Sequence, residues 1–241
     1  MIWLETKLFV REPVNAFFGI AFPALLLVVL GSAIPGFQDP VAELGGRRAI
    51  EGYLPITLTM AIATVAMVTL LGVLSGYREK GVLRRLSATP VSPRVLLGAQ
   101  VVVNVGALLV SCLLAWLAAA IVFDVGPPGN IAGFVLAFTL GSSAMCALAL
   151  AVAGLTPNAR ASSSVGSLIY FPMMFFAGVW TPGPLMPGAV QRIADFTPLG
   201  AASAALQDAW AGDWPQWGHL AVMAAFTVGL GAVAARYLRW E

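Results

Sequence analysis

The chain has 241 residues, of which 59% are hydrophobic and 10% are charged, and its formal net charge is +2. Together with a mean hydropathy of +0.89, this composition excludes a soluble domain with a polar surface and indicates one polytopic membrane domain. The net charge gives no reason to expect a nucleic-acid partner, because the basic residues form a collar at the membrane surface rather than a binding stripe.

Six apolar segments contain no Asp, Glu, Lys or Arg, and each can cross a hydrocarbon core that needs about 20 residues of helix. They are residues 14–34, 53–75, 95–123, 131–154, 161–180 and 219–235. We therefore predict an all-α membrane protein with six transmembrane helices. Residues 1–12 precede the first span, and we interpret them as a helix on the membrane surface, with Glu5 and Glu12 opposite Lys7 and Arg11.

The basic residues predict how these spans are oriented. Ten of the 13 Lys and Arg residues fall in alternate segments on one side, and only Arg47, Arg48 and Arg192 fall on the other. By the positive-inside rule, the side with ten basic residues is cytoplasmic, so both termini are predicted to be cytoplasmic. These ten are Lys7, Arg11, Arg78, Lys80, Arg84, Arg85, Arg94, Arg160, Arg236 and Arg239.

A short amphipathic helix is predicted in the cytoplasmic loop between the second and third spans, at residues 78–89. Val82, Leu83 and Leu86 share one helical face. Charged residues surround this face, and Thr89-Pro90 ends the helix. They are Arg78, Glu79, Arg84 and Arg85. From the spacing alone, this loop is either a docking site for another polypeptide or a basic hairpin that rests on anionic lipid.

Ionisable groups are missing from the spans, which disfavours an ion-coupled carrier. The chain also lacks a GxSxG nucleophile motif and a GxxxxGK[ST] phosphate-binding loop, so we do not expect an enzyme. If the protein performs work, a separate polypeptide must hydrolyse the nucleotide. His219, the one histidine, is expected to be a water-exposed residue at the outer membrane surface.

The spans themselves offer few candidates for function. Gly72 and Gly76 form a GxxxG pair that would let helices approach closely. Span five carries a run of aromatic and methionine residues that could close an apolar path, although such a run is more often plain core or lipid-facing surface. Pro172 permits a bend there. The run is Tyr170, Phe171, Pro172, Met173, Met174, Phe175 and Phe176.

The external segment 181–218 is long, apolar and interrupted by five prolines, which forbid one continuous helix. We predict two short re-entrant helices at about 186–194 and 198–210, the second capped by Thr197 with Pro198 in its first turn. Irregular backbone of this kind can enter a bilayer only where other parts of the protein shield its polar groups.

Two stretches resemble the ABC-2 type transporter permeases, in particular the daunorubicin and multidrug resistance permeases. The cytoplasmic loop is similar to the family's E-R-E-x-G-T-L-E-x-L-x-x-T-P-x-S pattern, with Val82 in place of the usual Thr and Arg84 in place of an acid. Its matching residues are Glu79, Gly81, Leu83, Leu86, Thr89, Pro90 and Ser92. The second stretch follows span five and matches through Gly178, Pro182, Met186, Pro187, Pro198 and Leu199.

The resemblance implies that residues 78–89 form the coupling helix, which seats in a groove of an ABC ATPase subunit. Residues 1–12 would be the interfacial helix, and the external segment would help to close the outer end of the path. The implied coupling residues are Glu79, Gly81, Val82, Leu83, Arg84, Arg85, Leu86, Thr89 and Pro90, and the implied closure residues are Pro182, Met186, Pro187, Pro198 and Leu199.

We therefore expect the permease subunit of an ATP-driven exporter in the bacterial cell membrane, paired with a second permease copy or a homologous permease and with two ATPase subunits. The ATPase subunits would use ATP and Mg²⁺, and this chain would hold neither a cofactor nor a metal. The expected cargo is an amphipathic drug or lipid-like molecule. The alternatives are export of a lipid-linked glycan and, in another class, an ATP-independent channel. The expected path lies along spans two and five, at Thr57, Thr59, Met60, Thr64, Met67, Tyr170, Met173, Phe175 and Phe176.

Overall fold

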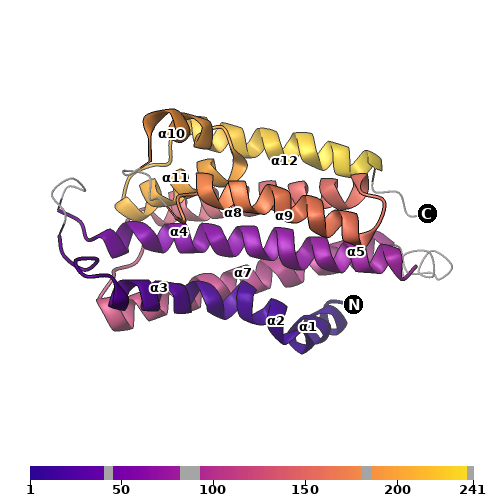
Figure 1. The fold of residues 1–241 in the computed structure, drawn as a ribbon, viewed down its shortest axis with the longest axis horizontal. Helices are drawn as coiled ribbons and strands as arrows, with labels where there is room; N and C mark the ends of the chain where they lie inside the picture. The colour runs from indigo at the N-terminus through magenta and orange to yellow at the C-terminus, as the bar shows by residue number, and fades with distance from the viewer. Residues whose placement is uncertain (41–45, 82–92, 181–185, 238–241) are drawn as a thin grey trace.

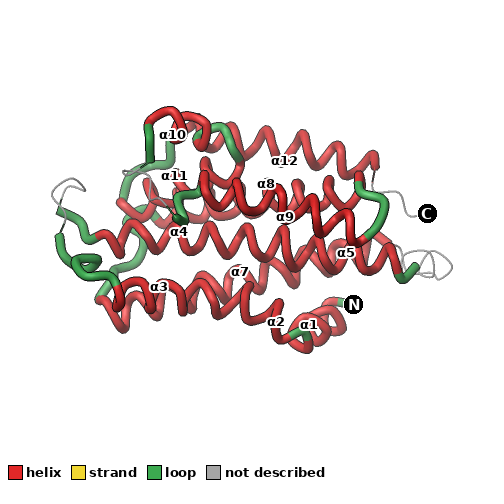
Figure 2. The backbone as a smooth tube through the Cα atoms, in the orientation of Figure 1, coloured by secondary structure: helices red, strands yellow, loops and turns green. Residues whose placement is uncertain are grey.

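The computed structural model describes residues 1–40, 46–81, 93–180 and 186–237. This part of the chain is helical, with no strand beyond a single antiparallel bridge between Pro40 and Arg48. Figures 1 and 2 show long helices that run alongside one another, with most of their connections at the two ends of the bundle. An apolar composition favours this arrangement, because each helix satisfies its own backbone hydrogen bonds.

The first half of the chain begins with α1 (Ile2–Arg11), α2 (Pro13–Ala16), a π-helical turn η1 (Phe17–Ala21) and α3 (Phe22–Ala33). A second continuous helix is built from α4 (Ala49–Thr64), a π-helical segment η3 (Val65–Leu70) and α5 (Leu71–Glu79), and α7 (Pro93–Phe123) follows it. The second half contains α8 (Ile131–Leu155), α9 (Ala159–Phe176), α10 (Gly188–Ala194), α11 (Pro198–Ala211) and α12 (Trp217–Tyr237).

In the described part of the chain, five helical segments are long and apolar enough to cross a membrane: Pro13–Ala33, Ala49–Glu79, Gly98–Phe123, Ile131–Leu155 and Trp217–Tyr237. The predicted span that is missing from this set is span five, which corresponds to α9 and is less apolar because Arg160 and three serines occupy its first turns. It also ends at Phe176 instead of residue 180. Gly178 adopts a left-handed φ of 84° there, which terminates the helix.

The helix formed by α4, η3 and α5 is the central element of the bundle. In its most apolar window 83% of the residues are buried, against 22% for the windows in α12 and the first span. Helices α3 and α7 pack on one part of its surface, while α8, α9 and α11 pack on others. The helices around it expose apolar side chains, as expected of surfaces that face lipid.

We call the end of the bundle that contains α1 and the C-terminal ends of α5 and α12 the inner end, after the predicted topology, and the opposite end the outer end (Figure 1). At the outer end, the Arg48 guanidinium donates to the carbonyl oxygens of Phe123 and Asp124 at 2.7 and 3.1 Å and pairs with Glu51 at 2.7 Å. These contacts join the start of the central helix to the end of α7. A basic side chain suits that place because the last carbonyls of a helix lack partners within it.

The external segment contains the two predicted short helices, α10 and α11. The Thr197 hydroxyl accepts a hydrogen bond from the Gly200 amide at 3.1 Å and caps α11, as predicted, with Pro198 in the first turn. Helix α11 is buried among α4, α8 and α12.

Candidate translocation path

The polar and flexible residues predicted to line a path in span two lie inside the subunit. Thr57, Met60, Thr64 and Met67 are only 1–6% exposed. The Thr57 and Thr64 hydroxyls donate to the carbonyls of Leu54 and Met60 at 2.7 and 2.8 Å. These threonines thus use carbonyls of their own helix, and Thr59, the fifth predicted residue, is buried as well. In the isolated subunit all five predicted residues pack against neighbouring helices.

The predicted gate run on α9 divides between two environments. Tyr170 and Met173 are half-buried against the core, and the Tyr170 hydroxyl lies 2.9 Å from the Thr64 hydroxyl on the central helix. Phe175 is exposed and Phe176 is half-buried. Met174, which the sequence did not single out from its neighbours, is the buried residue of the run. Tyr170 therefore faces the central helix and Met173 packs against the core, while Phe175 is exposed at the surface of the subunit.

A groove of about 260 Å³ separates the inner half of the central helix from α9. Ser163 and Ser167, one helical turn apart on α9, face Val68, Gly72 and Ser75 across it. Helix α9 approaches closely beside this groove, since a Cβ atom on Gly166 would lie 2.6 Å from Leu71. We call this feature the serine groove. The serine run was visible in the sequence, but its spacing does not reveal which serines face the central helix.

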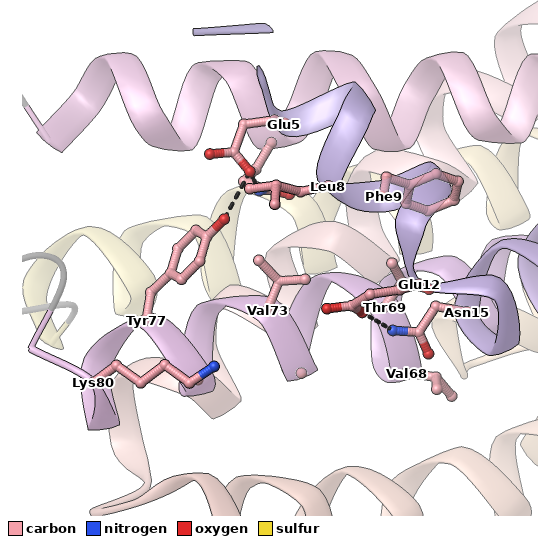
Figure 3. Close-up of a pocket in the computed structure, with 13 residues that line it drawn as sticks. Glu5, Leu8, Phe9, Glu12, Asn15, Val68, Thr69, Val73, Tyr77 and Lys80 are labelled. Carbon is pink, nitrogen blue, oxygen red and sulfur yellow. Dashed lines mark hydrogen bonds between the residues drawn. The ribbon is translucent and has the colours of Figure 1, made fainter. Parts of the chain in front are cut away.

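Val68 and Gly72 also border a second recess of about 450 Å³ on the other side of the central helix, between α1, α5 and α7. We call it the inner pocket (Figure 3). Val68 is 44% exposed although it belongs to the most buried helix of the bundle. A Cβ atom added to Gly72 or Gly76 would meet nothing within 4 Å. The GxxxG pair therefore does not pack against another helix in the described part of the subunit.

Glu5 supplies a buried carboxyl group to the inner pocket. It is 3% exposed, although α1 was predicted to be a surface helix. Its Oε2 atom accepts hydrogen bonds from the Tyr77 hydroxyl, at 2.7 Å, and from the Gln100 amide. Figure 3 shows Glu5 reaching from α1 towards Tyr77. These two bonds connect α1 to the end of the central helix and to the beginning of α7.

The outer end of α9 is fixed by hydrogen bonds from two other elements. The Tyr53 hydroxyl of α4 donates to the Val179 carbonyl at 2.7 Å, and the Ser203 hydroxyl of α11 donates to the Ala177 carbonyl at 2.7 Å. Of the predicted closure residues, Met186, Pro198 and Leu199 are buried, Pro187 is exposed and Pro182 lies outside the described residues.

A third recess, of about 350 Å³, lies at the outer end between α10, α11 and α12. His219 is buried beside it, contrary to the prediction of a water-exposed residue, and its Nε2 atom lies 3.4 Å from the Asp195 carboxylate. Burial raises the pKa of the Asp208 carboxyl above its ordinary value, and Asp213 acts in the same direction, while the Gln216 amide and His219 oppose this rise. No group of three His, Cys, Asp or Glu side chains suited to a metal ion occurs in the described residues.

The predicted coupling helix falls mostly outside the described residues, which include Glu79 and Gly81 but not Val82, Leu83, Arg84, Arg85, Leu86, Thr89 or Pro90. Gly81 has a φ of 63°, a left-handed conformation at the end of the central helix. The Arg78 guanidinium donates to the carbonyls of Ala153 and, at 2.9 Å, Thr156. Arg78 therefore binds the backbone of the α8–α9 turn, although it was predicted among the charged residues around the docking face.

Comparison with known protein families gives a match. The sequence pattern of the ABC-2 type transporter family matches residues 1–209, which include the central helix, the loop after it, α9 and most of α11. No curated protein matches the chain.

Proposed function

The chain belongs to the ABC-2 type transporter family, and on that premise we propose that it exports an amphipathic drug or lipid-like molecule from a bacterial cell. Membership makes it a multi-pass membrane protein and the permease subunit of an ABC transporter, whose ATPase is a separate subunit. In our proposal it lies in the inner membrane with both termini in the cytoplasm. A second permease copy, or a homologous permease, and two ATPase subunits complete the transporter.

The exposed strip on the central helix, formed by Val68 and Gly72 and continued by the half-buried Gly76, is the main observation that supports this proposal. Most of this helix is buried inside the subunit, so an exposed strip with two glycines is suited to a contact outside it. The strip separates the serine groove from the inner pocket. Both recesses combine apolar walls with a few polar groups, as sites for small amphipathic molecules do. A second permease placed against this strip would enclose them.

Active export of the cargo requires energy from the partner subunit, since the chain has no phosphate-binding loop. We propose that residues 78–89 receive this energy by docking on the ATPase. The loop follows the central helix directly, so a displacement of the loop acts on the helix that carries the exposed strip. Arg78 and Tyr77 would pass that displacement to the α8–α9 turn and to α1.

Transport by the assembled complex tests the proposal. The permease, purified with its ATPase from its host and reconstituted in proteoliposomes, should move a fluorescent amphipathic dye only when ATP is present. Dye movement without ATP would instead indicate a channel. Mass spectrometry of molecules that co-purify with the complex would reveal a lipid-linked glycan if that is the cargo, and would then overturn the drug assignment.

Substitution of Gly72 tests the exposed strip itself. Gly72→Leu should fold, because the space around its Cβ is open, but should reduce dye transport by obstructing the strip. Gly229→Leu is a matched control on the peripheral helix α12, where the added Cβ also meets nothing within 4 Å. Equal transport by both variants would show that the exposed strip is not part of the translocation path.

A further inference from the structure

The inner pocket contains more acidic side chains than are needed to hold α1 against the central helix and α7. Tyr77 and Gln100 both donate to one oxygen of Glu5, Oε2. No hydrogen bond to the other oxygen, Oε1, is present among the described residues. A carboxylate can accept hydrogen bonds at both oxygens. Oε1 is therefore available to a donor that enters the pocket.

A second carboxylate and an unpartnered hydroxyl line the same pocket. The Glu12 Oε2 atom accepts from the Asn15 amide at 2.6 Å, and Glu12 and Thr69 both line the pocket. Thr69 is 2% exposed, and its hydroxyl has no hydrogen-bond partner in the described part of the chain. Two acceptor groups and an unused hydroxyl in one recess suit a ligand that donates several hydrogen bonds.

The charge of the lining favours a cation. Two carboxylates, Glu5 and Glu12, face the pocket together with one ammonium group, Lys80. Lys80 lies after the last turn of α5, and the salt bridges found in the described residues do not include a pair between it and either carboxylate. A monovalent cation bound between Glu5 and Glu12 would balance the remaining negative charge of the pocket.

Apolar side chains form the remaining walls of the inner pocket. They are Leu8 and Phe9 on α1 and Val68 and Val73 on the central helix. The volume of about 450 Å³ is in the range of sites for drug-sized molecules. Helix α1 also exposes Trp3 and Val10, at 73% and 64%. Such a surface suits contact with the lipid interface, from which an amphipathic molecule could reach the pocket.

We propose that the inner pocket binds an ammonium group carried on an apolar body, with Glu5 and Glu12 as its acceptors. The group could belong to a cationic cargo molecule or to the headgroup of an aminophospholipid. This inference rests on the proposed function and narrows its cargo to amines. Val68 and Gly72 border both recesses, so a molecule that leaves the inner pocket past them reaches the serine groove.

Calorimetric titration of the intact complex in neutral maltoside micelles tests the pocket, with octylammonium as the probe and octanol as the neutral control of equal chain length. The wild type should bind octylammonium with clear preference over octanol. Glu5→Gln should weaken octylammonium binding about ten- to a hundredfold, because hydrogen bonds to charged groups are strong. Glu12→Gln, at an exposed position, should weaken it about two- to fivefold.

Asp124→Asn is the matched control, since it removes a carboxylate at the outer end and should leave octylammonium binding unchanged. If Glu5→Gln does not fold, octylammonium binding by Glu12→Gln alone tests the proposal. Equal binding of octylammonium and octanol by the wild type, or wild-type octylammonium binding by Glu12→Gln, would overturn the proposal.

Two further measurements identify the source of the ammonium group. A cargo site predicts that octylammonium stimulates ATP hydrolysis and that phosphatidylethanolamine is not enriched on the purified complex. A lipid site predicts enrichment of phosphatidylethanolamine over phosphatidylglycerol that is lost in Glu12→Gln. ATP-driven transport of neutral amphipaths without amine selectivity would refute this inference and leave the proposed function intact. Amine binding without ATP-driven transport would refute the proposed function alone.

Discussion

The hydrogen bond between Thr64 and Tyr170 joins the central helix to α9, and its direction can be deduced. The Thr64 hydroxyl has a single proton, which it donates to the Met60 carbonyl at 2.8 Å. The Tyr170 hydroxyl, 2.9 Å away, then donates to Thr64 Oγ1, because both contacts can form together only in this direction. Removing the donor and removing the acceptor should consequently have unequal effects.

Tyr170→Phe removes the donor and leaves Thr64 bonded to Met60, so the expected loss in the free energy of unfolding is that of one net hydrogen bond. This is about 0.5–1.5 kcal/mol in general, with an average of about 0.6 kcal/mol measured between membrane helices. Thr64→Val keeps the shape of the side chain but leaves the half-buried phenol hydroxyl without an acceptor, which costs about 1–3 kcal/mol. The double variant leaves no group unsatisfied and should resemble Tyr170→Phe.

Unfolding in graded denaturant, followed in mixed micelles, measures these differences, and ATP hydrolysis by the assembled complex shows whether the contact also matters for coupling. The expected order of destabilisation is Thr64→Val above Tyr170→Phe, with the double variant near the latter. A larger loss for Tyr170→Phe than for Thr64→Val would refute the assigned direction. Additive losses in the double variant would refute the contact itself.

Leu83→Asp combined with Leu86→Asp would place charge in an apolar docking groove, at a cost on the order of several kcal/mol. The ATPase should then no longer pull down the permease, while membrane insertion is kept. Retained pull-down would instead favour the interpretation that this loop rests on anionic lipid. Phe175→Ala should change which amphipathic compounds are exported, with a loss of about 1 kcal/mol or less in the free energy of unfolding. Met174→Ala, in the core, should lower the free energy of unfolding by about 2–5 kcal/mol. An unchanged export profile for Phe175→Ala would assign Phe175 to the lipid face. Burial raises the pKa of Asp208, so the folded state binds more protons than the unfolded state as the pH rises above 3.8, and wild-type stability should fall relative to Asp208→Asn as the pH increases from that value. A pH-independent difference in Tm would contradict this.

The long helices could be predicted from the sequence because a membrane span requires a long, charge-free run. Their ends were less predictable where a single residue decides them. Span five ends at Phe176 because Gly178 takes a left-handed conformation, and a chain with 25 glycines does not reveal which of them will do so. The Thr197 cap was predictable because Thr followed by Pro at a helix start uses local chemistry alone.

The candidate site was harder to predict, because it depends on partners distant in the sequence. Nothing near Glu5 indicates that Tyr77 and Gln100 will bury its carboxyl group, and Arg78 resembles a free surface charge until the α8–α9 turn is placed beside it. His219 is a similar case, since its buried imidazole lies beside Asp195, which follows α10 and is distant in the sequence. In each case, a polar group leaves water because a distant segment supplies its partner.

The threonines of span two show why polar residues in a membrane helix are weak indicators of a path. Thr57 and Thr64 each donate to a carbonyl of their own helix, so both can be buried without a polar surface beside them. Thr59 does the same with Pro55. Thr69, in the π-helical segment η3, differs because its hydroxyl has no partner in the described residues. A hydroxyl that is not satisfied by its own helix, beside an exposed glycine strip, is therefore better support for a binding surface than the number of threonines in the span.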